Sequence, residues 1–486
     1  MSDISQVSNE EPLEILKHPD PRLRERAKPV RRVNRNLRRL IERMAKTMYE
    51  ADGIGLAGPQ VGVMERLFVV DIGEGLKEFI NPEILEASEE QVELWEGCLS
   101  IPGLRGLVPR PSRVRVTALD RHGRRFWVDA DGWLARVIQH EYDHLEGVLF
   151  LDRALRVVEV PPESRLRVVF FGTSPFAGTV LERMLEREVT PLLVVTQPDR
   201  PRGRGQAPAP TPVKRLALEH ELDVAAPTRL RDAAFVERLK ALEPDVIVTA
   251  AYGRILPEDV LAVPKRAAVN VHASLLPRWR GAAPIQRALM AGDERTGVTI
   301  LHMSAELDAG DIILQKEAPI EPDDDFGSLH EKLAELGAEA LLEALRLIAK
   351  GEAPRRPQDA EGVTLAPPLR PEEEWIDWTR PAVEVRNHIR ALTPWPGARC
   401  LHGAELWKIA RTELAAAGEV RGGEPGEIVA VRPERGFAVA CGQGALWVTE
   451  LQPAGRRRMR ASDFLNGHRL EPGERLSSGA PGDEDA

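Results

Sequence analysis

A chain of 486 residues with an apolar fraction of 43% is long enough for about two to four domains, each with its own core. No apolar run approaches the length of a membrane-spanning helix, and the first residues lack the basic and apolar regions of a secretory signal, so we expect no membrane partner. The net charge of −10 restricts any nucleic-acid binding to local basic patches, and three widely spaced cysteines indicate a reducing, cytoplasmic location rather than a disulfide framework.

The first predicted helix covers residues 34–50. Apolar residues recur there at helical spacing and can form one packed face: Leu37, Leu40, Ile41, Met44 and Met48. Four arginines fall mostly off that face: Arg35, Arg38, Arg39 and Arg43. A solvated helix surface is the default interpretation of these arginines, and contact with ribosomal RNA is the alternative.

A glycine-rich stretch at residues 53–60 ends in the side-chain amide of Gln60. Farther along, one of the three cysteines stands in the sequence Glu96-Gly97-Cys98-Leu99-Ser100. Neither stretch identifies a function alone, but both contain polar groups of the kind that bind metals or developing negative charge.

The sequence His140-Glu141-Tyr142-Asp143-His144 is the strongest local signal in the chain. Residues four apart share one helix face, so His140 and His144 can reach the same metal ion, and Glu141 can act as a general base. Trp133 and Val137 lie seven and three positions before His140 and favour a helix with all three on one face. A surface helix with two solvated histidines is the alternative.

Cys98 favours the metal site over that alternative. A thiolate and two imidazoles give three protein ligands and leave a fourth position open, which is the arrangement of a catalytic rather than a structural centre. Iron, zinc and nickel all accept this set of ligands, so the residues do not choose among them.

These three stretches, in this order, resemble the motifs of peptide deformylases over about residues 12–160. The resemblance implies an α+β domain, which we place at residues 1–162, that hydrolyses the formyl group of N-formylmethionyl nascent peptides. The family's metal is typically Fe2+, with Zn2+ or Ni2+ able to occupy the site. Gly58 stands where the family commonly has alanine, and we expect a looser loop there.

The same resemblance implies roles for individual residues. The metal ligands are Cys98, His140 and His144, and the general base is Glu141. The amide of Gln60 and the backbone N–H of Leu99 would stabilise the oxyanion of the tetrahedral intermediate.

A proline-containing linker at residues 160–164 precedes a new domain, which we place at residues 165–350. Apolar runs at 166–171, 191–195 and 245–250 alternate with helical segments. This alternation favours a doubly wound, Rossmann-like α/β domain whose parallel sheet is buried on both faces. The turn after the first run has a single glycine, so we infer no nicotinamide cofactor.

A longer helix is predicted from residue 328. Ser328-x-x-Glu331 has the pattern of a capping box, which places the start of the helix at the serine. The apolar stripe of this helix consists of Leu329, Leu333, Leu336 and Leu341.

A second candidate site follows the apolar residues 267–269, at the end of a strand, where open α/β sheets bind their ligands. Asn270 and His272 are two residues apart and point the same way in an extended chain, and Asp308 lies downstream in a glycine-containing loop. An amide, an imidazole and a carboxylate suit acyl transfer to an amine: the amide binds the oxyanion, and the His–Asp pair manages the proton. Ordinary turn and hydrogen-bond residues are the alternative.

The C-terminal part differs in pattern from the rest of the chain. Residues 351–370 contain many prolines and little periodicity, which predicts an interdomain linker. Short strands at 427–431, 436–440 and 445–449 with glycine turns indicate a small OB-like β-barrel, which we place at residues 371–480. Cys400 and Cys441 have no nearby His or Cys partners and are interpreted as structural thiols.

Residues 165–478 resemble methionyl-tRNA formyltransferases. The resemblance is carried by Asn270 to Pro284, 196–205, 376–378, 451–455 and 464–467. It implies Asn270, His272 and Asp308 as the catalytic set and initiator Met-tRNA as the acceptor. It also implies 10-formyltetrahydrofolate as the co-substrate, bound near Ser274, Leu275, Leu276 and Pro277.

Two basic segments fit a tRNA substrate. Arg200, Arg202 and Arg204 suit the acceptor stem, with Arg204 as the main contact, although a mobile solvated loop is the alternative. Arg456, Arg457 and Arg458 would hold tRNA phosphates, which gives affinity and salt dependence rather than sequence choice.

The sequence therefore predicts a fusion of two enzymes that add and remove a formyl group, with independent active sites. One alternative is that one half is catalytically silent and serves as a binding module. The other is that the C-terminal part formylates a small amine substrate, against which the arginine-rich loop and the extra barrel speak.

Overall fold

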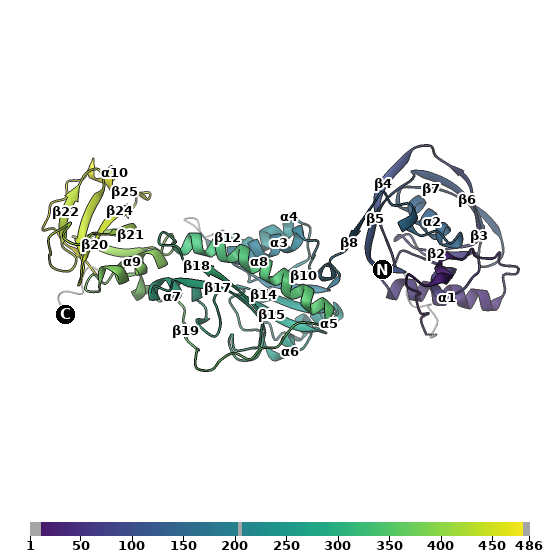
Figure 1. Cartoon of the computed structure of the whole chain (residues 1–486), viewed down its shortest axis with the longest axis horizontal. Coiled ribbons are helices and arrows are strands. Elements are labelled where there is room, and N and C mark those ends of the chain that lie inside the picture. The colour runs from purple at the N-terminus through teal and green to yellow at the C-terminus, as the bar shows by residue number, and fades with distance from the viewer. Residues whose placement is uncertain (1–10, 203–206, 480–486) are drawn as a thin grey trace. The chain divides into compact units, whose positions relative to one another are not determined.

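The computed structural model describes residues 11–202 and 207–479 of the chain (Figure 1). The chain divides into two compact units, Met1–Pro161 and Pro162–Ala486, which are described separately below. Within the described residues, none of the helices combines the length and the apolar character needed to cross a membrane.

From residue 11 onward, the first unit contains two helices, two antiparallel sheets and short 3-10 turns. The helices are α1 (Arg35–Glu50) and α2 (Gly132–Leu145), and the turns are η2 (Pro21–Arg24), η3 (Gly58–Val61) and η4 (Phe150–Asp152). The larger sheet has the order β1 (Gly55–Ala57), β2 (Leu67–Val70), β3 (Lys77–Ala87), β6 (Arg113–Leu119) and β7 (Arg125–Asp131). The smaller sheet has the order β4 (Gln91–Cys98), β5 (Ile101–Pro111) and β8 (Arg156–Glu159).

Side chains along β2 point alternately to the two faces of the larger sheet, and a helix packs against each face. Leu67 and Val69 point into the core that includes the apolar stripe of α1, whereas Phe68 and Val70 point into the core that includes α2. Helix α1 begins where predicted, with Asn34 as its N-cap. In α2, Val137 is buried, whereas Trp133, in the first turn of the helix, is 55% exposed.

The second unit begins with an α/β domain. Its helices are η5 (Pro162–Arg165), α3 (Pro175–Glu186), α4 (Pro212–Glu219), α5 (Ala233–Ala241), α6 (Glu258–Leu261), α7 (Pro284–Ala291) and α8 (Phe326–Lys350). Its main sheet has the order β13 (Val224–Ala225), β10 (Leu193–Val195), β9 (Val168–Gly172), β14 (Val246–Ala250), β15 (Ala267–His272), β17 (Arg295–His302) and β18 (Ile312–Pro319). Two small pairs complete it: β11 (Arg200–Arg202) with β12 (Ala207–Ala209), and β16 (Arg280–Gly281) with β19 (Leu365–Ala366).

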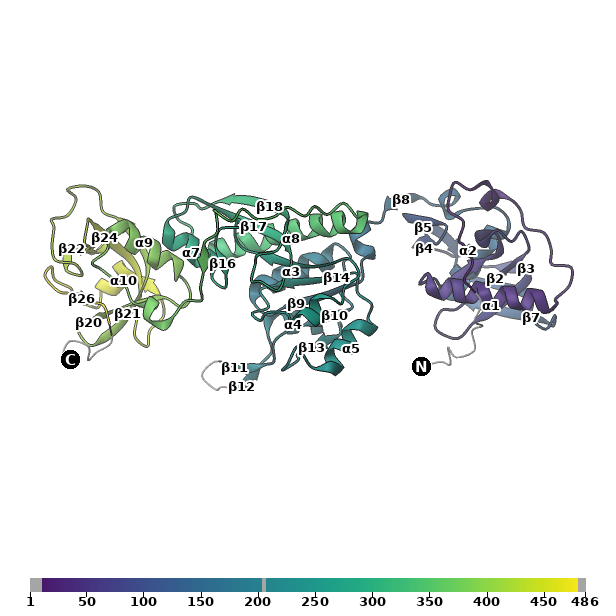
Figure 2. The same cartoon turned by 90° about the horizontal axis from the view of Figure 1, so that it is seen from below.

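The main sheet is buried on both faces, as its continuous apolar runs predict (Figure 2). Val168 and Phe170 of β9 pack with α3 and α8, and Val169 and Phe171 pack with α5 and α6. The sheet is parallel only from β13 to β15. Strands β17 and β18 join antiparallel at one edge, so the expectation of a fully parallel sheet is wrong there.

Helix α8 begins two residues earlier than the sequence pattern predicts. Its N-cap is Asp325, whose carboxylate accepts the backbone N–H of Ser328 at 2.9 Å. Ser328 occupies the third helical position and completes the capping box from the other side, at 3.2 Å from the N–H of Asp325. Serine and aspartate are both favourable N-cap residues, so the pattern predicted Ser328 as the N-cap where the structure has Asp325.

The C-terminal part consists of a curled antiparallel sheet with helices beside it. The helical segments are η6 (Pro371–Glu374), α9 (Ala382–Ala391) and α10 (Ala461–Leu465). The sheet has the order β22 (Ile428–Arg432), β23 (Gly436–Ala440), β24 (Ala445–Pro453), β21 (Glu405–Leu414), β20 (Ala398–His402) and β26 (Leu476–Ser477), and β25 (Met459–Arg460) pairs with β24. Backbone bonds from Ile428 N to Glu474 O and from Leu476 N to Gly426 O, both 2.8 Å, join the two ends of this sheet.

The core of the C-terminal sheet contains large aromatic side chains, including Trp378, Trp407 and Phe437. Cys400 is buried in this core, and burial raises the pKa of its thiol well above the ordinary range. Burial likewise raises the pKa of Cys441 to about 12. Both thiols are therefore protonated and unreactive at neutral pH, which agrees with their interpretation as structural.

The cap of α8 gives a test of local stability. Replacing Asp325 by alanine leaves the N–H of Ser328 without its acceptor, so the first turn should lose about 1 kcal/mol of protection against opening. Amide hydrogen exchange at residues 326–330 measures this directly. Asp323→Ala, at a side chain that is 81% exposed, is the matched control and should leave the exchange rates unchanged. Equal rates in the Asp325 and Asp323 variants would contradict the assignment of the cap.

Candidate functional sites

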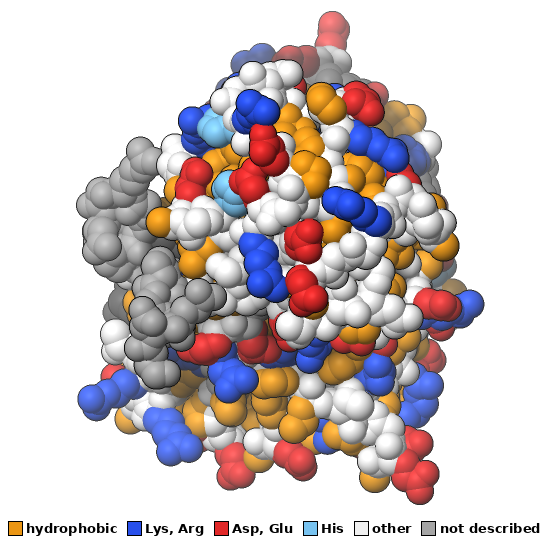
Figure 3. Space-filling model, turned by 90° about the vertical axis from the view of Figure 1, so that its left-hand side faces the viewer, with side chains coloured by type: hydrophobic (Ala, Val, Ile, Leu, Met, Phe, Trp, Pro, Cys, Tyr) orange, Lys and Arg blue, Asp and Glu red, His pale blue; other side chains and the backbone are white. Residues whose placement is uncertain are grey.

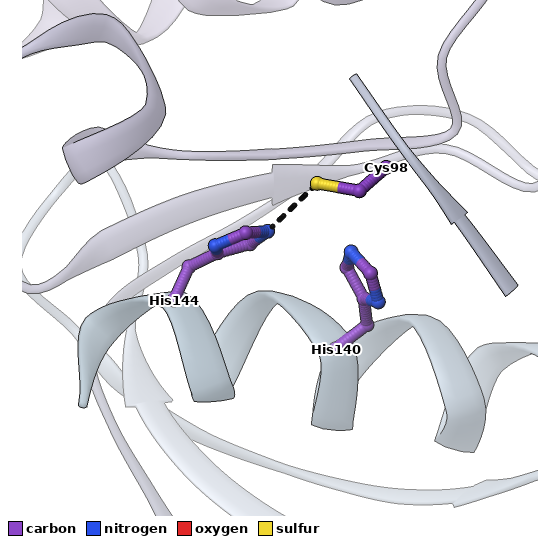
Figure 4. A group of neighbouring side chains, drawn as sticks. All are labelled: Cys98, His140 and His144. Carbon is purple, nitrogen blue, oxygen red and sulfur yellow. Dashed lines mark hydrogen bonds between the residues drawn. The ribbon is translucent and has the colours of Figure 1, made fainter. Parts of the chain in front are cut away.

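Three predicted metal ligands meet in the first unit. Helix α2 presents His140 and His144 one turn apart, and Cys98 approaches them from the end of β4 (Figure 4). One donor atom from each residue lies within 4.8 Å of the other two, and Cys98 Sγ is 3.3 Å from His144 Nε2. The rings of His140 and His144 meet edge to face, with 5.0 Å between their centroids. Backbone elements far apart in sequence therefore bring together a sulfur and two nitrogens.

A buried ionic network fixes the orientation of His140. Glu96 Oε2 lies 2.9 Å from His140 Nδ1, and the same carboxylate accepts bonds from Arg110 and Arg136 at 2.5 to 2.9 Å. Burial by itself would raise the pKa of Glu96, but the bonds from His140 and Arg110 lower it to about 2. The ionised carboxylate can accept a hydrogen bond from Nδ1–H of His140, which leaves the Nε2 lone pair for a metal.

Glu141 is placed beside the three donors without being one of them. Its side chain is buried, and among the described residues Oε2 has no hydrogen-bond partner. Burial raises the pKa of Glu141 to about 7. Gly55 of β1 approaches so closely that a Cβ there would lie 2.4 Å from Glu141 Oε1, which explains the glycine at this position. An unpartnered carboxyl group with this pKa can take up and release a proton at neutral pH.

The predicted oxyanion donors lie at the same site. Gln60 Oε1 accepts the N–H of Ala57 at 2.7 Å, and this bond turns Gln60 Nε2 toward Cys98 Sγ, 3.5 Å away. Leu99 follows Cys98 directly, so its backbone borders the cluster, and its carbonyl accepts a bond from Lys17 at 2.6 Å.

The turn that carries Gln60 is tight rather than loose. A Cβ on Gly58 would lie 2.7 Å from Val63 O and 2.8 Å from Glu65 O. The expectation of a looser loop at Gly58 is therefore wrong, because the missing side chain allows closer packing of the backbone.

The donor set fits a catalytic metal ion. Although burial opposes ionisation of Cys98, the adjacent imidazoles of His144 and His140 hold the pKa of its thiol well below the usual value. A thiolate is the form that binds metals, and the orphaned carboxyl of Glu141 supplies a base at the same place. This chemistry agrees with a metal held by Cys98, His140 and His144.

The second predicted constellation assembles at the end of β15 in the second unit. Thr249 of β14 donates to Asn270 Oδ1 at 2.8 Å and so turns the Asn270 amide toward Asp308 Oδ1, 3.3 Å away. Asp308 Oδ2 accepts the N–H of Gly281 at 2.9 Å and lies 3.6 Å from His272 Nδ1. Asn270, His272 and Asp308 therefore lie together although 38 residues separate the first from the last.

The tautomer of His272 follows from its other neighbour. His272 Nε2 is 2.9 Å from the carbonyl oxygen of Trp279, which can only accept. Nε2 must then carry the proton, and in a neutral ring Nδ1 has a free lone pair facing Asp308. A base oriented by a carbonyl and next to a carboxylate is arranged to receive one proton.

A cavity of about 600 Å³ opens at this constellation. Asn270, His272 and Asp308 line it together with apolar groups that include Phe176 and Met303. The predicted co-substrate residues Ser274, Leu275, Leu276 and Pro277 are not part of its lining: Leu276 is buried with Leu301 and Ile312, and Ser274 Oγ donates to Arg278 O at 2.7 Å. The structure therefore does not bring these four residues to the cavity wall.

The structure describes the side chains of only some of the arginines predicted to contact tRNA. Arg200 and Arg202 lie in β11, whose side chains are not described, and Arg204 lies outside the described residues. Arg456 and Arg457 are exposed and make no ion pair with the described residues, whereas Arg458 pairs with Glu450 at 2.7 Å. Basic and acidic side chains are mixed over the end of the molecule formed by the C-terminal sheet (Figure 3), so any attraction of phosphate there is local.

Sequence reasoning missed the network behind His140. Glu96 stands two residues before the predicted cysteine ligand, which was an available signal because a ligating histidine usually donates its other N–H to a carboxylate. Arg110 and Arg136 offered no such signal, since only the folded chain places them beside Glu96.

Comparison with known families agrees with this division of the chain. The family described as polypeptide deformylase matches residues 12–159. The families described as formyl transferase and as formyl transferase, C-terminal domain, match residues 166–345 and 368–469.

Individual relatives match one part of the chain each. The methionyl-tRNA formyltransferase of Symbiobacterium thermophilum is 50% identical over 312 residues, which is 64% of this chain and 95% of that protein. The corresponding protein of Geobacter sulfurreducens is 46% identical over 311 residues, 64% of this chain and 96% of that protein. The crystal structure of peptide deformylase from Thermotoga maritima is 46% identical, with a TM-score of 0.30, and covers 30% of this chain and all of that one.

Glu96 can be tested through metal affinity. Glu96→Gln removes the negative charge of the group that accepts the His140 Nδ1–H hydrogen bond, so affinity for a divalent metal should fall at least about tenfold in a competition titration with a chelating dye. Glu93→Gln, on the exposed part of the same strand, is the matched control. Unchanged affinity in a folded Glu96 variant would show that this carboxylate does not orient the ligand.

Proposed function

Because this chain belongs to the methionyl-tRNA formyltransferase family and carries a polypeptide deformylase domain before it, we propose that two separate centres add and remove a formyl group. The chain is a bifunctional protein with a hydrolase part and a transferase part. The observation that carries the proposal is that each part assembles a complete set of chemical groups, one around Cys98 and one around Asn270.

In the hydrolase part, a metal held by Cys98, His140 and His144 would polarise the formyl carbonyl as a Lewis acid. Glu141 Oε2 takes the proton of the attacking water and later gives it to the departing amine of the peptide. Gln60 Nε2 and the N–H of Leu99 stabilise the negative charge that develops on the formyl oxygen. The direction of the Gln60 amide, fixed by the N–H of Ala57, supports its role.

In the transferase part, the amino group of Met-tRNA attacks the formyl carbon of 10-formyltetrahydrofolate. Asn270 Nδ2 donates to the oxygen of the tetrahedral intermediate, and His272 Nδ1 accepts the proton that the amine must lose. Asp308 faces that ring at 3.6 Å and stabilises the imidazolium that results. When the intermediate collapses, the proton passes to the departing nitrogen of the folate.

The formyl donor would occupy the cavity of about 600 Å³, whose apolar wall suits a planar ring system. Contact with Ser274, Leu275, Leu276 and Pro277 stays a prediction. The buried position of Leu276 favours an indirect role, in which this turn supports the end of β15. Fe2+ is the proposed metal of the hydrolase part, with Zn2+ and Ni2+ as alternatives.

We also propose that the curled C-terminal sheet is an OB-like barrel that binds tRNA. The hydrogen bonds between its end strands and the exposed Arg456 and Arg457 support this assignment. The hairpin with Arg200 and Arg202 would reach the acceptor stem together with Arg204. We further propose that the acceptor is initiator tRNA and that the peptide substrates are nascent chains. The proposal also includes contact with the ribosome through α1 and a cytoplasmic location.

The two sets of catalytic groups can be tested separately in one protein. Glu141→Gln should lower deformylation of a formyl-Met peptide by about 10² to 10⁴-fold and leave formylation unchanged, because Glu141 lies in the other unit. Asp308→Asn should do the reverse. Steady-state assays of both reactions on each variant make every chain its own control. Normal deformylation after loss of Glu141, or normal formylation after loss of Asp308, contradicts the corresponding role.

Binding of tRNA gives a salt-dependent test. Arg456→Ala combined with Arg457→Ala removes two phosphate contacts, so the slope of log affinity against log salt should fall by about two, without a change in affinity for 10-formyltetrahydrofolate. Filter binding of Met-tRNA over a range of salt measures the slope. Arg469→Ala is the control, because that guanidinium pairs with Glu471 at 2.9 Å. An unchanged slope in the double variant places the tRNA elsewhere.

A further inference from the structure

The segment at residues 354–366, predicted as part of a linker, lies along both loops that carry the transferase residues. Arg356 and Ile312 exchange backbone hydrogen bonds of 2.8 and 3.1 Å. Farther on, β19 pairs with β16, and Gly281 of β16 is packed so closely that a Cβ there would lie 2.5 Å from Ala366 O. The segment is therefore an ordered part of the catalytic domain rather than a free connection.

Gln358 is the side chain of this segment that contacts both loops at once. Its Nε2 donates to the carbonyl oxygens of Asp308 and Gly310, at 2.7 and 2.8 Å. Its Oε1 accepts two bonds from the guanidinium of Arg280, at 3.0 and 2.8 Å. Both ends of one carboxamide are thus used, each toward a different loop.

The loop of Asp308 needs such support. Asp308 has a φ of +50°, a conformation that residues with a side chain seldom adopt and that persists only where neighbouring groups hold it. Gly310 is packed against the carbonyl of His302 with no space for a Cβ. The donors of Gln358 bind the carbonyls of Asp308 itself and of Gly310, just after this φ angle, and resist its relaxation.

The oxygen of the Gln358 side chain supports the carboxylate of Asp308 indirectly, through Arg280. Arg280 immediately precedes Gly281, whose N–H donates to Asp308 Oδ2 at 2.9 Å. Holding Arg280 therefore holds the donor that orients the carboxylate, while the Nε2 bonds hold the backbone that carries it. The two effects together fix the distance from Asp308 Oδ2 to His272 Nδ1, which is 3.6 Å.

We infer that Gln358 is a positioning residue for formyl transfer, which acts by holding the Asp308 loop and the Arg280–Gly281 loop in register. The inference rests on the proposed role of Asp308. Gln358 itself is not among the residues that line the cavity, so its loss should alter the rate of the chemical step rather than substrate binding. Displacement of a catalytic group by about 1 Å can cost about 10²-fold in rate.

The test uses the full chain with Gln358→Met, which keeps the length of the side chain and removes both polar ends. We expect kcat for formylation to fall about 10- to 100-fold, with KM for Met-tRNA and for 10-formyltetrahydrofolate within about twofold of wild type. Gln358→Glu keeps an acceptor for Arg280 but loses the donors to the carbonyls, and should show a similar loss. Gln443→Met, at an exposed glutamine in the turn between β23 and β24, should behave as wild type.

Two measurements separate positioning from general damage. Deformylation by the same chains reports the concentration of intact protein, and equilibrium binding of 10-formyltetrahydrofolate counts folded transferase sites. An unchanged kcat in Gln358→Met, a rise in KM alone, or a loss of binding sites in proportion to the loss of rate would each overturn the inference. Asp308→Asn is assayed in parallel: if it formylates normally, the role of Asp308 fails, and the reason for positioning it fails too.

Discussion

In each part of the chain, a hydrogen-bond acceptor faces one nitrogen of a histidine ring and thereby decides what the other nitrogen can do. Glu96 lies 2.9 Å from His140 Nδ1 and can accept its N–H, which leaves Nε2 free for the proposed metal. In the transferase part the two ring nitrogens exchange these positions, because the carbonyl oxygen of Trp279 accepts the Nε2–H of His272 and Nδ1 faces Asp308. The same pair of residue types thus supports a ligand in one place and a base in the other.

Both carboxylates depend on support from residues distant in sequence. Glu96 remains ionised although buried, because the bonds from His140 and Arg110 lower its pKa, and removing one member of such a network leaves an uncompensated charge. Asp308 is held by backbone donors and by a backbone conformation that its neighbours enforce. His140, Glu141, Asn270 and His272 lie on regular elements, whereas Asp308 lies in a loop.

The sequence predicted the groups that come together at the two sites better than the residues that support them. His140 and His144 could be paired from helical spacing, and the roles of Cys98 and Asp308 from family resemblance, but Arg136 and Gln358 make contacts that no local pattern records. The same limit explains other errors: an apolar run does not reveal whether a strand such as β17 pairs parallel or antiparallel. A proline-rich segment is likewise read as a linker when its hydrogen bonds to Ile312 and Arg280 cannot be seen.

Two centres with separate chemistry should respond separately to loss of metal, and this is the most direct test of the account. The full chain is treated with a chelator, and both reactions are measured in the same sample before and after Fe2+ is restored. We predict that deformylation is lost and then recovered, while formylation of Met-tRNA stays constant throughout. Deformylation that survives metal removal, or formylation that falls with it, would contradict the account.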